Sequence, residues 1–157
     1  MNTLIVYASK YGTTEKCAKM IKNQINNQVE LINLKNLKDV NLSKYDNVII
    51  GGSIYIGKIQ KEVTEFCLKY LDILKEKRIG LFICGMQDAD VINTELSQSF
   101  PIELLKIAVV KEYLGGEFLI DKMGFMDKII VKKISKVTSN KSNILEDEIQ
   151  KFAQAMK

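Results

Sequence analysis

The stretch that decides the fold is TLIVYASKYGTT, residues 3–14. It opens with a short, continuous apolar run from Thr3 to Ala8 that is rich in β-branched residues, the pattern of a strand buried on both faces. Ser9 and Gly12 follow, and then apolar residues at helical spacing over residues 17–25. A strand, a tight turn and a helix in this order predict the start of a β-α-β unit.

The same alternation continues along the chain. Four further strand-like runs cover residues 29–34, 47–50, 79–84 and 108–114, each ahead of small or polar residues. Apolar residues at helical spacing cover residues 63–74, 91–98 and 145–156; the second of these helices can restart at Pro101, and the third follows a polar link over residues 138–143. Strands that alternate with helices predict a five-stranded parallel sheet covered by helices on both faces, in one domain over residues 1–157.

The composition excludes several kinds of chemistry. The 157 residues contain no histidine, so Ser-His-Asp and Cys-His nucleophiles, an imidazole base and histidine-ligated metals are absent. The net charge of +4 is small and dispersed, and no nucleic-acid-binding motif accompanies it. We therefore expect no nucleic-acid partner, no metal site and no catalytic side chain, and a reactive group that is bound rather than built in.

Cysteines and termini indicate the compartment. Cys17, Cys67 and Cys84 are odd in number and widely spaced, without a C-x-x-C motif, which favours buried thiols in a reducing compartment. The N-terminus lacks the features of a signal peptide, and no apolar run reaches the length of a transmembrane helix. These features predict a cytoplasmic protein.

The exits of the predicted strands are the places to look for a ligand, because ligands of open α/β sheets bind beyond the carboxyl ends of the strands. After the first strand, Ser9, Thr13 and Thr14 offer hydroxyls and Gly12 permits a tight turn before a helix, whose free N–H groups favour an anion such as a phosphate. A simple strand-to-helix turn with an N-cap explains the same residues. The chain has neither a Walker loop nor a G-x-G-x-x-G motif.

Residues 9–14 resemble the [ST]-x-x-G-x-T phosphate loop of the flavodoxins. The resemblance implies a doubly wound flavodoxin-like sheet of strand order 2-1-3-4-5 and an FMN cofactor. It assigns the FMN phosphate to Ser9, Lys10, Tyr11, Gly12, Thr13 and Thr14. It places the isoalloxazine ring between Ser53, Ile54, Tyr55, Ile56 and Gly57 on one side and Gly85, Met86 and Gln87 on the other. Tyr55 either stacks on the flavin or caps the sheet.

Residues 51–58 and 124–133, with Gly115 and Gly116, resemble a narrower group of bacterial flavodoxin-domain proteins that includes quinone-dependent protoporphyrinogen dehydrogenase. Three functions stay open at this point. One is a redox protein that passes electrons through FMN to a partner protein. Another is an enzyme of the protoporphyrinogen dehydrogenase type with a quinone acceptor, and the last is a flavodoxin-like binding module without flavin. Electron-carrier flavodoxins are typically acidic, and the net charge of +4 sets this chain apart from them.

Residues 125–137 have the pattern of an amphipathic helix. Met126, Ile130, Ile134 and Val137 fall on one face, and Lys128, Lys132, Lys133 and Lys136 fall largely on the other. Either the apolar stripe joins the core beneath a solvated basic face, or the helix contacts anionic lipid at the inner membrane face or an acidic redox partner. Lys58 occupies a position where flavodoxins usually carry an acidic residue, so we expect it to make the flavin potential less negative.

Overall fold

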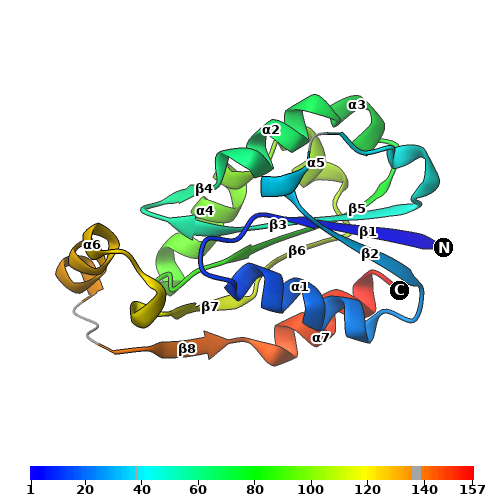
Figure 1. Ribbon diagram of the computed structural model, residues 1–157. Helices are drawn as coiled ribbons and strands as arrows, with labels where there is room; N and C mark the ends of the chain where they lie inside the picture. Colours follow the sequence, from blue (N-terminus) through cyan, green and yellow to red (C-terminus); the bar gives the residue numbers. More distant parts are fainter. Residues whose placement is uncertain (38, 136–138) are drawn as a thin grey trace.

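The computed structural model describes residues 1–37, 39–135 and 139–157 (Figure 1). In this part of the chain, five parallel strands form one sheet of order β2-β1-β3-β5-β6. A two-residue strand, β4, pairs antiparallel with the end of β3. The strands are β1 (Asn2–Tyr7), β2 (Gln28–Asn33), β3 (Asn47–Tyr55), β4 (Lys58–Ile59), β5 (Arg78–Cys84) and β6 (Val110–Tyr113). The predicted five parallel strands and their order are confirmed.

Helices cover both faces of the sheet (Figure 1). On one face lie α1 (Thr13–Gln24) and α7 (Glu146–Ala155), and on the other lie α2 (Lys61–Lys69), α3 (Leu71–Leu74), α4 (Ala89–Ser99) and α5 (Ile102–Ile107). Three short 3-10 helices complete the connections: η1 (Leu34–Asn36), η2 (Leu42–Lys44) and η3 (Ile120–Lys122). The helix restart at Pro101 is confirmed, because α5 begins one residue after it. No described helix has the length and apolar character needed to cross a bilayer.

Each central strand contributes to two cores, because successive side chains point to opposite faces. Leu4 and Val6 pack on the α2 side, whereas Ile5 and Tyr7 pack on the α1 side. Burial on both faces explains why these strands read as continuous apolar runs. The three cysteines are buried and free, as predicted.

Three predicted boundaries are wrong. Residues 51–53 were expected beyond the third strand, but β3 continues to Tyr55, and Gly51 lies where the Phe82 ring leaves no room for a Cβ atom. The helix expected over residues 63–74 breaks at Tyr70, whose φ of −107° and ψ of 14° end α2. The last parallel strand begins at Val110 rather than at residue 108, because Ala108 forms the C-cap of α5.

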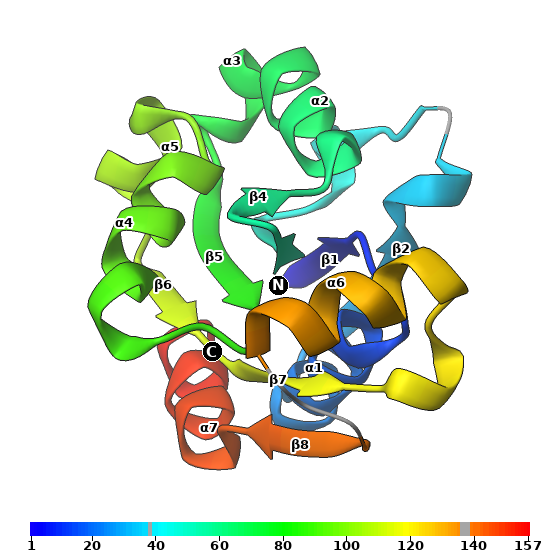
Figure 2. The same ribbon diagram turned by 90° about the vertical axis from the view of Figure 1, so that its left-hand side faces the viewer.

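The region between β6 and α7 differs most from the prediction. Instead of a polar link, β8 (Lys141–Ile144) pairs antiparallel with β7 (Gly115–Phe118), and α6 (Phe125–Ser135) lies between them in sequence. Thr138, where the predicted link begins, lies outside the described residues. We call residues 115–144 the insert. Figure 2 looks onto the carboxyl ends of the parallel strands and shows α6 lying across them.

Two glycines join the insert to the sheet. Gly115 has a φ of +76°, and a Cβ atom there would lie 2.0 Å from the carbonyl oxygen of Asn143. At Gly116 a Cβ atom would lie 2.5 Å from the backbone of Gly85, whose N–H donates to the Gly115 carbonyl. Only residues without a side chain allow β7 to lie this close to both β8 and the end of β5.

Candidate functional site

The first loop forms an open helix N-terminus. Gly12, the residue before α1, has a left-handed φ of +99°, and its N–H donates to Ser9 Oγ at 2.9 Å. No described side chain caps α1, so the N–H groups of its first turn stay available. A Cβ atom built on Gly12 meets nothing within 4 Å in the described chain, so space lies beside the turn. This geometry suits an anion.

The buried hydroxyl of Thr14 is a second indication that a ligand binds at this loop. Its side chain is fully buried, and its hydroxyl oxygen has no hydrogen-bond partner among the described residues. The Cys84 thiol, a weak hydrogen-bonding group, lies beside it. A buried hydroxyl without a partner costs free energy unless a ligand or water satisfies it, which indicates a polar ligand at this loop.

Asp127 of α6 is the centre of a polar cluster. Its carboxylate accepts hydrogen bonds from the hydroxyls of Tyr11 and Tyr55, the second at 2.6 Å, and lies 2.8 Å from Lys10 Nζ. These interactions, led by the one with Lys10, lower the pKa of Asp127 to about 2. Burial and the contact with Asp127 raise the pKa of Tyr55 to about 12 and raise that of Tyr11 as well. Asp127 therefore ties the first loop, the end of β3 and α6 together.

A second carboxylate from the insert contacts the first loop. Glu117 of β7 accepts a hydrogen bond from Thr13 Oγ1 at 3.0 Å and lies 3.4 Å from Lys16 Nζ. Burial raises the pKa of Glu117, but its interactions with Ser142, Thr13 and Lys16 outweigh burial and lower it overall. Three of the side-chain donors of the first loop, Lys10, Tyr11 and Thr13, are thus engaged by acidic residues of the insert.

The hairpin between β3 and β4 carries the predicted ring-binding residues. Ile56 (φ 50°) and Gly57 (φ 72°) form its two-residue turn, and Tyr55 pairs with Lys58 across it. A left-handed conformation is unfavourable for a β-branched residue such as Ile56, and strain of this kind concentrates at ligand sites. The Ser53 N–H donates to Gln60 Oε1 at 2.8 Å, and Ser53 Oγ accepts from the same side chain, so Gln60 holds the base of the hairpin.

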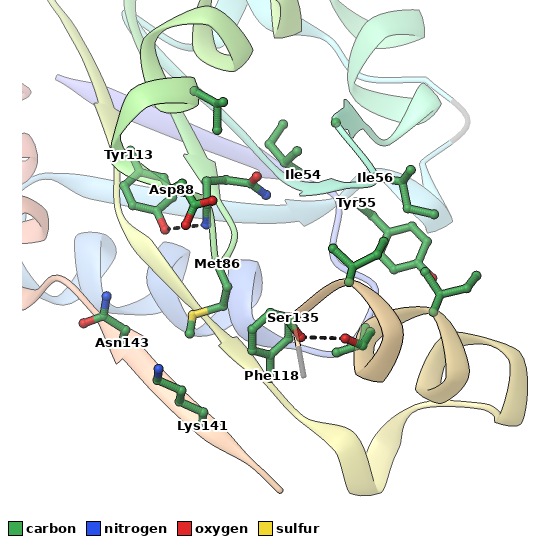
Figure 3. A pocket seen from close by; sticks show the side chains of 16 residues that line it. Ile54, Tyr55, Ile56, Met86, Asp88, Tyr113, Phe118, Ser135, Lys141 and Asn143 are labelled. Carbon is green, nitrogen blue, oxygen red and sulfur yellow. Dashed lines mark hydrogen bonds between the residues drawn. The ribbon is translucent and has the colours of Figure 1, made fainter. Parts of the chain in front are cut away.

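Tyr113 of β6 orders the loop after β5, and no sequence pattern singled it out. Its hydroxyl donates to the Gly85 carbonyl and accepts from the Gln87 N–H at 3.2 Å. Met86 lies between these two residues and projects into the space in front of the sheet (Figure 3).

Two neighbouring cavities collect the predicted site residues, and Figure 3 shows the larger one. The larger, of about 660 Å³, lies between the hairpin, the loop after β5 and α6, and its volume is typical of small-molecule sites. The residues that line it and that the sequence predicted for the site are Ile54, Tyr55, Ile56, Gly57, Met86 and Gln87. The smaller, of about 80 Å³, adjoins the first loop and is lined by Ser9, Lys10, Tyr11, Thr13, Thr14, Ser53 and Gly85, again with Ile54, Tyr55 and Met86. Gly12 shapes the loop without lining either cavity.

Helix α6 forms a wall of the site that the sequence did not predict. Ile130, Val131 and Ile134 line the larger cavity. The alternative in which the apolar stripe joins the core is wrong for Met126 and Ile134, which are 66% and 70% exposed. Ile134 borders the larger cavity, whereas Met126 lines neither cavity. Lys136 and Val137 lie outside the described residues. Asp127 lies within residues 124–133, which carry the resemblance to the narrower group, and this resemblance is the sequence signal that could have led to it.

Comparison with known proteins identifies the family. The model of the family described as flavodoxin domain matches residues 4–144. The chain belongs to the flavodoxin-domain family. A flavodoxin from Maridesulfovibrio salexigens is 32% identical over 95 residues, which cover 55% of this chain and 64% of that protein, less than two thirds of its length.

Solved flavodoxins share the fold of this flavodoxin-domain protein. The solution structure of two-electron reduced Megasphaera elsdenii flavodoxin has a TM-score of 0.59 at 16% identity, covering 97% of this chain and 98% of that one. A Fusobacterium nucleatum flavodoxin bound to flavin mononucleotide has a TM-score of 0.55 at 14% identity, covering 99% and 96%. Likenesses at this level of identity establish the flavodoxin-like architecture.

Proposed function

We propose that this chain binds one FMN non-covalently and transfers electrons through it. The observation that carries the proposal is the uncapped N-terminus of α1 with the buried, unpartnered hydroxyl of Thr14 beside it. Both features fit a phosphate, and the cavity of about 660 Å³ lies close by for the ring. A similarly folded Fusobacterium flavodoxin is described as bound to flavin mononucleotide, which supports the choice of cofactor.

The residues of the chain bind and orient the cofactor. The N–H groups at the start of α1 and the Thr14 hydroxyl hold the phosphate, with Ser9 and Gly12 shaping the turn. Tyr55, held by Asp127, presents its ring next to the larger cavity, where offset packing on a flat ligand is favourable. FMN supplies the redox chemistry when bound. The proposal assigns no side chain as acid, base or nucleophile.

A visible absorption spectrum of the freshly purified protein, followed by titration with FMN, tests the proposal. We expect a flavin spectrum or saturable uptake, and weaker binding by Thr14→Ala than by the wild-type protein. Thr64→Ala, on the exposed side of α2, is the matched control and leaves the affinity unchanged. A colourless protein that refuses FMN would overturn the proposal and favour a binding module without flavin.

A second candidate is an oxidoreductase of the protoporphyrinogen dehydrogenase type that uses a quinone acceptor. The apolar wall that Val91, Ile130 and Ile134 give the larger cavity favours it, since a flat apolar substrate needs such a surface. Steady-state oxidation of protoporphyrinogen with a menaquinone analogue tests this candidate. Fast electron exchange with a reductase, without any porphyrin oxidation, favours an electron carrier that serves a partner protein.

The outer face of α6 supports a proposal for location. Phe125, Met126 and Ile129 are 77%, 66% and 45% exposed, and Lys128, Lys132 and Lys133 lie among them. Exposed apolar side chains interleaved with lysines suit the surface of an anionic bilayer. We propose a cytoplasmic protein that rests on the inner membrane face through α6. Co-sedimentation with anionic but not with zwitterionic vesicles tests this, and lysine-dependent binding to an acidic protein alone would contradict it.

A further inference from the structure

The Asp127 cluster has a property that FMN binding alone does not require. Lys10, the one basic side chain of residues 9–14, already has an anionic partner in Asp127, 2.8 Å away. Its ammonium also lies 3.8 Å from the centre of the Tyr55 ring. The cation that a phosphate would seek at this loop is therefore neutralised from within the chain.

The carboxylate is held firmly in this place. Two tyrosine hydroxyls donate to Asp127, and both reach it from the site's own walls, the first loop and the hairpin. The side chain of Asp127 is 20% exposed and that of Lys10 is 41% exposed, so their attraction is moderate and an incoming anion can compete for the ammonium. A phosphate that carries up to two negative charges both competes for Lys10 and is repelled by Asp127.

We propose that Asp127 sets how strongly this site prefers a phosphorylated flavin over an unphosphorylated one, by acting as an internal anion on Lys10. This inference rests on the proposed binding of FMN. On this basis Asp127 weakens binding of FMN relative to binding of riboflavin, because only the phosphate of FMN must displace it from Lys10. Asp127 is then a specificity-determining residue that lies on α6, far in sequence from the phosphate loop.

Equilibrium titrations of the full chain with FMN and with riboflavin, followed by flavin fluorescence, test the inference. We expect Asp127→Asn to increase the ratio of FMN affinity to riboflavin affinity about three- to fivefold, the scale of one partly exposed ion pair. Any loss that comes from weaker support of Tyr55 and α6 affects both flavins alike and cancels in this ratio. Asp121→Asn, in the same insert and with the same change in charge, is the control: Asp121 is exposed and contacts Asn140, and this variant leaves both affinities unchanged.

Substitution of Lys10 provides a second test of the inference. Lys10→Gln lowers the affinity for FMN but not for riboflavin, and adding Asp127→Asn in that background brings little further gain, because the competition no longer exists. If Asp127→Asn binds both flavins more tightly by the same factor, the carboxylate only restricts access to the cavity by holding α6 over it. If it binds both flavins more weakly by the same factor, the carboxylate only positions the residues of the site. Either result overturns the inference.

The inference and the proposed function fail in different ways. If the wild-type protein binds FMN and Asp127→Asn keeps the wild-type ratio of FMN affinity to riboflavin affinity, the inference alone is overturned. If neither the wild-type protein nor any variant binds either flavin, the proposed function is overturned and the inference with it. Circular dichroism of each variant confirms that the fold is retained in every comparison.

Discussion

The central strands and helix α6 carry similar apolar side chains but bury them to opposite extents. In β1, Leu4, Ile5 and Val6 are fully buried, because helices cover both faces of the sheet. In α6, Phe125, Met126 and Ile134 are between 66% and 77% exposed, and of the helix only Val131 is buried. Since few buried contacts hold α6, it belongs to the part of a structure that opens at low cost, and its specific anchor is polar: the Asp127 cluster.

The largest effect expected from this comparison concerns the sheet. Ile5→Ala removes a fully buried side chain between β1 and α1 and should lower the free energy of unfolding by about 2–5 kcal/mol. Ile134→Ala deletes the same atoms from an exposed position and should change it by less than about 0.5 kcal/mol. Urea unfolding measures both. Similar losses in the two variants would show that α6 is packed as tightly as the sheet.

The next largest effect on stability is expected where β7 of the insert meets the end of β5. Gly116→Ala places a methyl group 2.5 Å from the Gly85 backbone, which must shift, at an expected cost of about 1–3 kcal/mol. Gly124→Ala is the control within the same insert, because its Cβ atom meets nothing within 4 Å in the described chain; we expect a change within about 0.5 kcal/mol. Thermal unfolding measures the two variants, and equal stabilities would refute the close approach of β7 to β5.

The anchor of α6 should depend on pH. The folded pKa of Asp127, about 2, lies below its usual value, so its stabilising effect is complete above about pH 5 and is lost as the pH falls through about 2. At neutral pH, Asp127→Asn should reduce the protection of the α6 amides against hydrogen exchange by about 1 kcal/mol. The difference from the wild-type protein should decrease below about pH 4 and fall to less than half of its neutral value by about pH 2. A difference that stays as large at low pH as at neutral pH would show that the charge of Asp127 is not what holds α6.

The smallest expected effect lies on the surface of the hairpin. Lys58 is exposed on β4, next to Gly57 of the proposed ring site. A cation there stabilises the negative charge of the reduced flavin. Lys58→Glu should therefore lower the reduction potential of the bound FMN by about 20–60 mV. A redox titration of the FMN-bound protein measures the shift, with Lys61→Glu at the exposed start of α2 as the control. A wild-type potential below that of Lys58→Glu would contradict the proposed role of Lys58.

Different parts of the site could be predicted to different extents. The first loop was readable because its signal is local: Gly12 provides the left-handed turn, and Thr13 begins α1 directly after it. Asp127 was not, since its partner Tyr11 is 116 residues away and no local pattern links the two. Tyr113 was missed for the same reason, because its hydroxyl acts on Gly85 and Gln87 of another strand's loop.

The sequence by itself determined the parallel sheet and the loop at the start of α1, because burial on both faces and a glycine-containing turn leave marks on neighbouring residues. The strand order followed from the resemblance of that loop to the flavodoxins. Only the tertiary structure decided which way α6 turns its apolar side chains. A helical period defines a face of a helix but not what that face meets, and the helix came to rest over a cavity. Ile130 and Ile134 of its apolar stripe line that cavity, and the carboxylate of Asp127 supplies the hydrogen bonds that tie α6 to the first loop and the hairpin.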